Sequence, residues 1–231
     1  MHPTRHQPPR VTRYTTLLVA FVVCLACTSM PHAGEFALSK QLLTDIEQQY
    51  GGYARQRVLF WNDLIIANRD LDEIDKLKKV NEFFNELEFV SDIDHWGKED
   101  YWATPLQMLT SNGGDCEDFS IAKYFTLREM GVPEDRMRLT YVKALELNQA
   151  HMVLTYYSAP DAEPLVLDNL VADILPSSQR NDLLPVYSFN GNGLWLAKSS
   201  GTDQRIGHPS RLSRWKEVIA KISDERIPLS H

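Results

Sequence analysis

Hydrophobic residues recur at helical spacing through much of the first half of the chain. The longest stripe runs from Leu77 to Val90, where apolar side chains alternate with Lys, Glu and Asn at the period of an amphipathic helix. A further helix is predicted from about Asp115 to Met130, because the following Gly131 and Pro133 are typical of helix ends. The segment between them, residues 91–105, is polar and rich in aromatic residues and is predicted to be a connection.

After Pro133 the pattern changes to short apolar runs with the composition of strands. A hairpin is predicted at Gly191-Asn192, and a helix around Arg214–Ile222 is expected near the end of the chain. Helices followed by consecutive short strands favour an α+β fold with an antiparallel sheet in a single domain. The predicted strands cover residues 137–145, 151–158, 164–170, 184–190 and 193–198.

The N-terminus has the pattern of a secretory signal peptide. Three arginines precede an uncharged run over residues 15–27, which is too short to span a bilayer as a helix. Small residues follow, and Ala33 is a plausible last residue before cleavage. Residues 1–33 are therefore predicted to be a secretory signal peptide, and residues 34–231 a single domain. An uncleaved anchor and a lipoprotein signal ending at Cys27 are the alternatives.

Loss of residues 1–33 changes the charge and the cysteine content. The whole chain of 231 residues has a formal net charge of −7, and the leader contains three Arg and no acidic residue, so its removal leaves −10. This acidic balance argues against a nucleic-acid partner. Of three cysteines only Cys116 remains. It cannot form an intramolecular disulfide, and an oxidising compartment does not protect an idle thiol, so we expect a chemical role.

Cys116 lies in the segment GGDCEDFS, residues 113–120. The two glycines predict a tight turn, Asp115 is a suitable N-cap, and Cys116 then falls in the first turn of a helix. Free backbone N–H groups and the helix dipole stabilise a thiolate there, and they can hold an oxyanion when a carbonyl is attacked. Cys116 is therefore a candidate nucleophile. The alternative is an inert buried cysteine beside an ordinary helix cap.

His151 and Asp168 are candidates for the base and the residue that orients it. His151 begins the most apolar predicted strand, and Asp168 is a charge at the end of the apolar run LVL on the next one. Burial of an unpaired carboxylate is very costly, so Asp168 must be paired or exposed. An antiparallel pair of these strands would bring both residues to one end of the sheet and form a Cys-His-Asp triad. A core histidine and a strand-end turn residue are the alternatives.

Three acidic residues surround the candidate nucleophile: Asp115, Glu117 and Asp118. Their charges oppose ionisation of the thiol, and carboxylate oxygens are good ligands for Ca²⁺. Acidic residues also favour a helix N-terminus without any metal, so the residues alone leave both interpretations open. Zinc is disfavoured, because the chain has no His-x-x-x-His pair and no second cysteine beside Cys116.

The segments GGDCEDFS, AHMVLTYY and LVLDNL, read in that order, resemble the bacterial transglutaminase-like cysteine proteinases, the family of the LapG-type periplasmic adhesin proteases. The resemblance implies a papain-like, transglutaminase-like fold, in which an N-terminal helical lobe packs on a C-terminal antiparallel sheet. It implies a triad of Cys116, His151 and Asp168. It also implies a need for Ca²⁺, with Asp115 and Glu117 as ligands, to which Asp118 is added on geometric grounds.

The same resemblance implies a biological role. Family members are exported endopeptidases that cut a large cell-surface adhesin near its N-terminus, beside paired small residues, and the release of the adhesin promotes biofilm dispersal. A LapD-like inner-membrane receptor for cyclic-di-GMP is implied as the partner that sequesters the protease.

Other functions are compatible with the same residues. An amide-transferring transglutaminase and a cell-wall peptide hydrolase both use a Cys-His pair. A non-catalytic exported binding module is a third alternative, in which Tyr187, Phe189 and Trp195 would present an apolar docking surface, although these aromatics also suit a sheet core.

Overall fold

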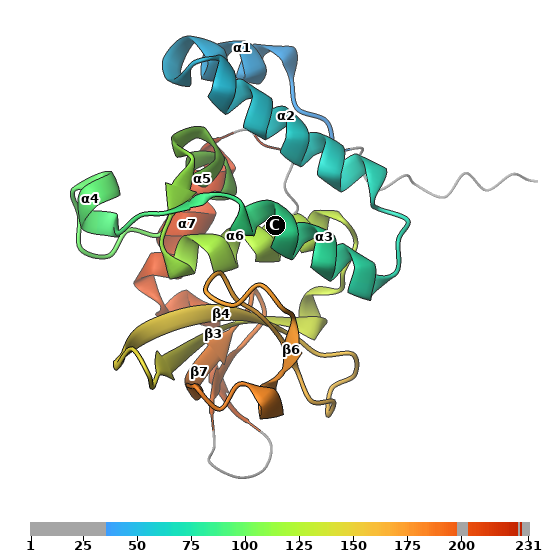
Figure 1. Ribbon diagram of the computed structural model, residues 1–231, viewed down its shortest axis with the longest axis vertical. Helices are drawn as coiled ribbons and strands as arrows, with labels where there is room; N and C mark the ends of the chain where they lie inside the picture. Colours follow the sequence, from blue (N-terminus) through green and yellow to red (C-terminus); the bar gives the residue numbers. More distant parts are fainter. Residues whose placement is uncertain (1–35, 198–202, 226, 228–231) are drawn as a thin grey trace, which may run out of the picture. The chain divides into compact units, whose positions relative to one another are not determined.

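The computed structural model describes residues 36–197, 203–225 and 227, so the predicted signal peptide, residues 1–33, lies outside the described residues. Helices form most of the first half of the described chain, as predicted (Figure 1). The helices are α1 (Lys40–Tyr50), α2 (Gly52–Ala67), α3 (Glu73–Asn85), α4 (Asp92–Trp96), α5 (Pro105–Ser111), α6 (Cys116–Glu129) and, after the strands, α7 (Ser213–Asp224).

Most of the later strands pair in one antiparallel sheet, which has seven strands within the described residues and the order β6-β5-β4-β3-β7-β8-β9. The five predicted strands are all present, with ends that differ by up to three residues. The strands of this sheet are β3 (Met137–Ala144), β4 (Gln149–Tyr156), β5 (Leu165–Leu167), β6 (Leu175–Pro176), β7 (Leu183–Phe189), β8 (Leu194–Leu196) and β9 (Gln204–Gly207). The α+β prediction is therefore confirmed.

The main core lies between the helices and one face of the sheet. Leu139, Leu154 and Phe189 on the sheet are fully buried against side chains such as Trp61 and Phe125 from the helices. Because strand residues alternate between faces, the neighbours of these residues point the other way. There a smaller cluster forms around Val142, Val153 and Val166.

Helix α6 is buried over most of its length, because the sheet packs on one side of it and α2, α3 and α5 pack on others (Figure 1). A helix in this position needs apolar residues all round, yet α6 also buries Asp118, Ser120 and Lys123. Buried polar groups require hydrogen-bond partners, so these three side chains mark the helix as part of a polar network.

The turn before α6 differs from the prediction. Gly113 and Gly114 form a short strand, β2 (Gly113–Gly114), parallel to β1 (Glu88–Phe89), and the left-handed turn residue is Asn112, with φ of 68°. The glycines are needed for close approach. A Cβ on Gly114 would lie 2.4 Å from a carboxylate oxygen of Asp118, and one on Gly113 would lie 2.5 Å from a backbone oxygen.

Within the described residues, no helix is both long enough and apolar enough to cross a membrane.

Candidate active site

Cys116 is the first residue of α6, and its half-buried side chain lies beside β4. Its thiol is 3.0 Å from Oε2 of Glu117. The Ser120 hydroxyl, one turn on, lies 2.9 Å from the Cys116 carbonyl oxygen and 3.1 Å from that of Met152. The backbone N–H of Met152 also donates toward the sulfur. The start of α6 is thus fixed against the strand that carries His151.

The pairing of β5 explains why this edge of β4 is free to contact α6. Strand β5 pairs only with residues Leu154–Tyr156 of β4. The backbone groups of Met152, two residues before that pairing begins, therefore remain available to Ser120 and Cys116. This arrangement places the nucleophile candidate at the open end of the strand pair.

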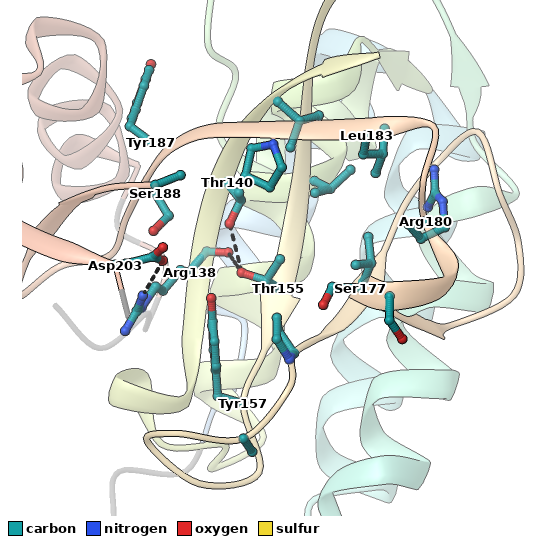
Figure 2. Close-up of a pocket in the computed structure, with 18 of the residues that line it drawn as sticks. Arg138, Thr140, Thr155, Tyr157, Ser177, Arg180, Leu183, Tyr187, Ser188 and Asp203 are labelled. Carbon is teal, nitrogen blue, oxygen red and sulfur yellow. Dashed lines mark hydrogen bonds and ion pairs between the residues drawn. The ribbon is translucent and has the colours of Figure 1, made fainter. Parts of the chain in front are cut away.

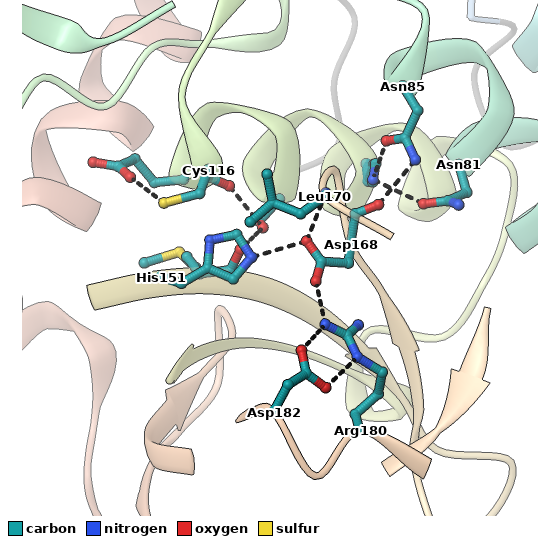
Figure 3. A network of polar contacts seen from close by, with 12 residues as sticks. Asn81, Asn85, Cys116, His151, Asp168, Leu170, Arg180 and Asp182 are labelled. Atoms are coloured by element: carbon teal, nitrogen blue, oxygen red, sulfur yellow. Dashed lines mark hydrogen bonds and ion pairs between the residues drawn. The ribbon is translucent and has the colours of Figure 1, made fainter. Parts of the chain in front are cut away.

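His151 and Asp168 form a direct contact in the structure (Figure 3). Their Nε2 and Oδ1 atoms are 2.8 Å apart, and the exposed fractions of the two residues are 2% and 1%. His151 is the third residue of β4, which begins at Gln149, and not the first as predicted. Because Nε2 faces the carboxylate, Nδ1 is the ring nitrogen left for the thiol. The antiparallel β4–β5 pair thus brings both residues to one end of the sheet, as expected.

Asp168 has a second partner that the sequence did not indicate, Arg180. Its Nη2 lies 2.7 Å from Oδ2 of Asp168, while the backbone N–H of Leu170 donates to Oδ1 at 3.0 Å. Burial by itself raises the pKa of Asp168. The hydrogen bond and the charge of His151, together with Leu170 and Arg180, outweigh burial and lower this pKa to about 2. Asp168 is therefore a carboxylate held ionised by its neighbours.

Cys116 and His151 line one cavity, of about 620 Å³, which is of the size that accepts a small ligand or a peptide segment. Tyr141 and Tyr187 stack in it, with ring centroids 5.1 Å apart. The cavity combines aromatic walls with an acidic margin. Its lining consists of Glu99, Asp100, Trp102, Asp115, Cys116, Glu117, Tyr141, Ala150, His151, Met152, Tyr187, Leu212, Ser213 and Arg214.

A separate cavity of about 580 Å³ lies on the sheet face that points away from the main core (Figure 2). Its floor includes Val142 and Val153, with the paired hydroxyls of Thr140 and Thr155 2.8 Å apart. Arg180 also lines it. The candidate nucleophile and base, Cys116 and His151, line the first cavity and not this one.

Acidic side chains gather at the start of α6. Asp115 and Glu117 flank Cys116, as the sequence shows, and the structure adds Asp92 and Asp100. One oxygen from each of Asp92, Asp100 and Glu117 lies within 4.8 Å of the others, and the same holds for Asp92, Asp115 and Asp118. Asp92 Oδ1 and Asp115 Oδ1 are buried and have no hydrogen-bond partner among the described residues.

The role of Asp118 differs from that of its neighbours. It belongs to one of these sets, with Asp92 and Asp115, but both of its oxygens face backbone N–H groups: Ala103 at 2.6 Å and Asp115 at 3.4 Å. Asp118 thus fixes the start of α6 and the adjoining segment. Whether it also binds a cation stays a prediction.

The acidic groups shift one another's pKa. Burial is the largest cause of the rise in the pKa of Asp115 to about 10, and repulsion from Glu117, Asp118 and Asp92 adds to it. Burial also raises the pKa of Asp92, to about 6, although the N–H of Tyr101 opposes the shift. For the Cys116 thiol, burial and then Glu117 and Asp115 raise the pKa well above its ordinary value.

These features fit a hard divalent cation. Asp92 and Asp115 each have a buried carboxylate oxygen without a partner in the described part of the chain, and the two residues are close enough to share one ion. Calcium binds to carboxylate oxygens grouped in this way. Asp92 and Asp100 were not predicted as ligands, because they lie in the polar connection 91–105. The high density of acidic residues in that connection is the feature of the sequence that could have indicated them.

Comparison with known proteins places the chain in one family. The family model described as bacterial transglutaminase-like cysteine proteinase matches residues 63–195. No curated protein matches the chain.

Among solved structures, LapG from Legionella pneumophila is similar in an EGTA-treated form, with 43% identity over 80% of this chain and 98% of that one and a TM-score of 0.71. A calcium-bound form of the same protein gives 43% identity, the same coverage of this chain, 99% of that one and a TM-score of 0.69. These matches confirm the expected transglutaminase-like protease fold, and the chain belongs to the family of bacterial transglutaminase-like cysteine proteinases.

Proposed function

We propose that this chain is a calcium-dependent cysteine endopeptidase with Cys116 as nucleophile, His151 as base and Asp168 as the residue that orients the base. One observation carries the proposal: the His151–Asp168 contact of 2.8 Å lies in the strand pair against which the sulfur of Cys116 is held. Such an arrangement gives a thiol, a base and an orienting carboxylate their roles in acyl transfer.

The chemistry follows from the positions of these groups. His151 Nδ1 takes the thiol proton as Sγ attacks the peptide carbonyl carbon. Backbone N–H groups at the start of α6 are placed to stabilise the oxyanion. His151 then protonates the leaving amine, and the C–N bond breaks to leave a thioester on Cys116. Water, deprotonated by the same imidazole, hydrolyses the thioester and restores the thiol.

Calcium would be held by Asp115 and Glu117, with Asp92 and Asp100 contributing from the preceding segment. When bound, the ion supplies positive charge that offsets the carboxylates and favours the thiolate form of Cys116. Support comes from the unpaired buried oxygens of this site and from the calcium-bound structure of the Legionella relative. Asp118 is retained as a candidate ligand on the basis of its place in the same cluster.

The proposed substrate is the N-terminal region of a large cell-surface adhesin, whose release would promote biofilm dispersal. We propose that residues 1–33 direct the protein to the periplasm, and that a LapD-like inner-membrane receptor for cyclic-di-GMP controls access to the substrate. Family membership and the signal-peptide pattern at the N-terminus support these proposals.

The test is incubation of residues 34–231 with N-terminal fragments of large adhesins from the same cell, with Ca²⁺ or with EGTA, followed by mass spectrometry. The expected result is two product peptides whose summed mass exceeds that of the substrate by one water, with Ca²⁺ only. The Cys116→Ala protein is the control and should be inactive. Cross-linked products would favour a transglutaminase, and cleavage of cell-wall peptides alone would favour a peptidoglycan hydrolase.

The non-catalytic alternative has little support in the structure. Phe189 is fully buried in the core, and Tyr187 stacks on Tyr141 inside the catalytic cavity. Trp195 lies under the guanidinium of Arg138, with 4.1 Å between the guanidinium carbon and the ring centroid. These aromatics pack within the protein and do not gather as one apolar docking surface.

A further inference from the structure

We infer that Arg180, held in place by Asp182, is a positioning residue for the proposed protease: it fixes the carboxylate plane of Asp168 so that Oδ1 faces His151. The inference rests on the proposed function. It concerns residues that lie outside the triad and far from the acidic cluster in the sequence.

The geometry divides the two oxygens of Asp168 between different partners (Figure 3). Oδ1 is hydrogen-bonded to His151 and accepts from the backbone N–H of Leu170. Oδ2 accepts a hydrogen bond from Arg180 Nη2 at 2.7 Å. A carboxylate with one free oxygen can rotate about its Cβ–Cγ bond. With Oδ2 occupied by a guanidinium, such rotation would break a short charged hydrogen bond.

Arg180 is itself oriented by a bidentate pair with Asp182. Its Nε and Nη2 lie 2.9 Å and 2.8 Å from the two carboxylate oxygens of Asp182. The guanidinium is thus bound in one plane, and the exposed fraction of Arg180 is 5%. The connection between β6 and β7 supplies both residues, so a separate segment of the chain supports the triad.

The charges in this group also suit a positioning role. Two carboxylates, Asp168 and Asp182, share the one guanidinium, which leaves the three groups with a net charge of −1. Asp168 can therefore still stabilise the positive form of His151 during the reaction. An arginine without Asp182 would neutralise Asp168 more fully and weaken that effect.

The backbone of Asp168 has independent anchors. The Asn85 side-chain N–H donates to the Asp168 carbonyl oxygen at 2.9 Å, and Lys123 Nζ lies 2.7 Å from the Asn85 side-chain oxygen. These contacts hold the main chain at Asp168 when the Arg180 side chain is changed. The contribution of Arg180 can therefore be separated from general support of the loop.

The hydrogen bonds of the buried Arg180 side chain are incomplete, which also points to a positioning role. Its Nη1 is buried and has no partner among the described residues. Burying an unpaired donor costs stability, so a purely structural arginine would be a poor choice at this position. Only a guanidinium can donate to both carboxylates, Asp168 and Asp182, from one planar group, and this explains why the residue is an arginine.

The experiment compares Arg180→Met, Arg180→Lys and Asp182→Asn with a matched control, Arg138→Met. Arg138 lies on β3, lines the same cavity as Arg180 and pairs with Asp203 at 3.1 Å. We expect Arg180→Met to lower kcat about 100-fold with KM within about two-fold, because misplacement of a catalytic group affects the chemical step. Arg180→Lys should recover part of the rate, Asp182→Asn should lose less, and Arg138→Met should stay near wild type.

NMR of ¹⁵N-histidine-labelled protein gives a readout that does not require turnover. The His151 Nε2 proton, hydrogen-bonded to Asp168, should show a downfield resonance in wild type and in Arg138→Met, and it should shift or broaden in Arg180→Met. If Arg180→Met does not fold, Arg180→Lys and Asp182→Asn carry the test. An unchanged kcat and an unchanged resonance would overturn the inference. Should wild type cleave nothing, the proposed function fails, while the resonance still decides the role of Arg180.

Discussion

The Asp168 carboxylate contacts His151 and the acidic cluster surrounds Cys116, and these two carboxylate sites are built in opposite ways. Asp168 is surrounded by donors from His151, Leu170 and Arg180, and its pKa is lowered to about 2. Asp115 is surrounded by other acids, and burial and their repulsion raise its pKa to about 10. Both oxygens of Asp168 have hydrogen-bond partners within the protein, whereas the acidic cluster has buried oxygens without partners among the described residues.

The difference indicates which half of the site would need the proposed calcium ion. Orientation of the imidazole comes from the fold alone, because every group that holds Asp168 is supplied by the protein. Ionisation of the thiol is opposed by the acidic cluster until positive charge arrives there. We therefore expect changes on the Asp168 side to affect turnover at any calcium concentration, and changes on the Asp115 side to alter the calcium requirement itself.

The largest effect is expected from Cys116→Ala. Removal of the nucleophile should abolish turnover, a loss on the order of 10⁶-fold if only background reaction remains. Cleavage of an adhesin fragment measures it. The variant should keep the calcium-dependent rise in melting temperature, because the acidic ligands are unchanged. Retained turnover would refute the assignment of the nucleophile.

Replacement of Asp168 by Asn should lower kcat by about 10³- to 10⁴-fold, because an amide at this position favours the wrong tautomer of His151. His151→Ala should be as inactive as Cys116→Ala. Initial rates at saturating Ca²⁺ measure both variants. If added Ca²⁺ restored Asp168→Asn to wild-type rates, the separation of the two sites would be wrong.

The rise in melting temperature caused by Ca²⁺ should depend on the acidic cluster and not on acidic residues elsewhere on the surface. Ca²⁺ at 100 times its Kd should stabilise wild type by about 2.7 kcal/mol, which corresponds to a melting-temperature rise of about 5–10 °C for a domain of this size. Asp115→Asn should lose most of this rise, whereas the exposed control Asp70→Asn should keep it. Differential scanning calorimetry with Ca²⁺ or EGTA measures the shift. An equal rise in both variants would remove Asp115 from the ligand set.

The smallest effect is the pH dependence of stability contributed by Asp168. A folded-state pKa lowered from 3.8 to about 2 contributes about 2 kcal/mol, present above the unfolded pKa and lost as the pH falls through the folded one. Urea unfolding of wild type and Asp168→Asn in EGTA should therefore show a larger difference at pH 7 than at pH 3. A difference that grew toward acid would mean that the carboxyl is not held ionised.

Most of the fold follows from local patterns. The alternation of apolar residues placed β3, β4 and β7 to within two residues of their ends, because those strands have one face in the core. Strands β6 and β9 and helix α4 were not predicted. They are two to five residues long, which is too short for a hydrophobic period to show.

The candidate site was predictable where chemistry is local and not where tertiary contacts build it. Cys116 with its flanking acids occupies one segment, and the order of His151 and Asp168 on neighbouring strands indicated their pairing. Arg180 gives no such signal, because it lies in a polar connection and becomes significant only when that connection folds against Asp168. The same holds for Asp92, which reaches the cluster from α4.

Alkylation of Cys116 by iodoacetamide tests most directly whether this sulfur is made reactive by its two neighbouring sites. Residues 34–231 contain no other cysteine, so incorporation of one label reports on Cys116 alone. Calcium should accelerate labelling of wild type, and His151→Ala should remove most of that acceleration. Slow labelling at one rate, with or without Ca²⁺ and with or without His151, would contradict the account.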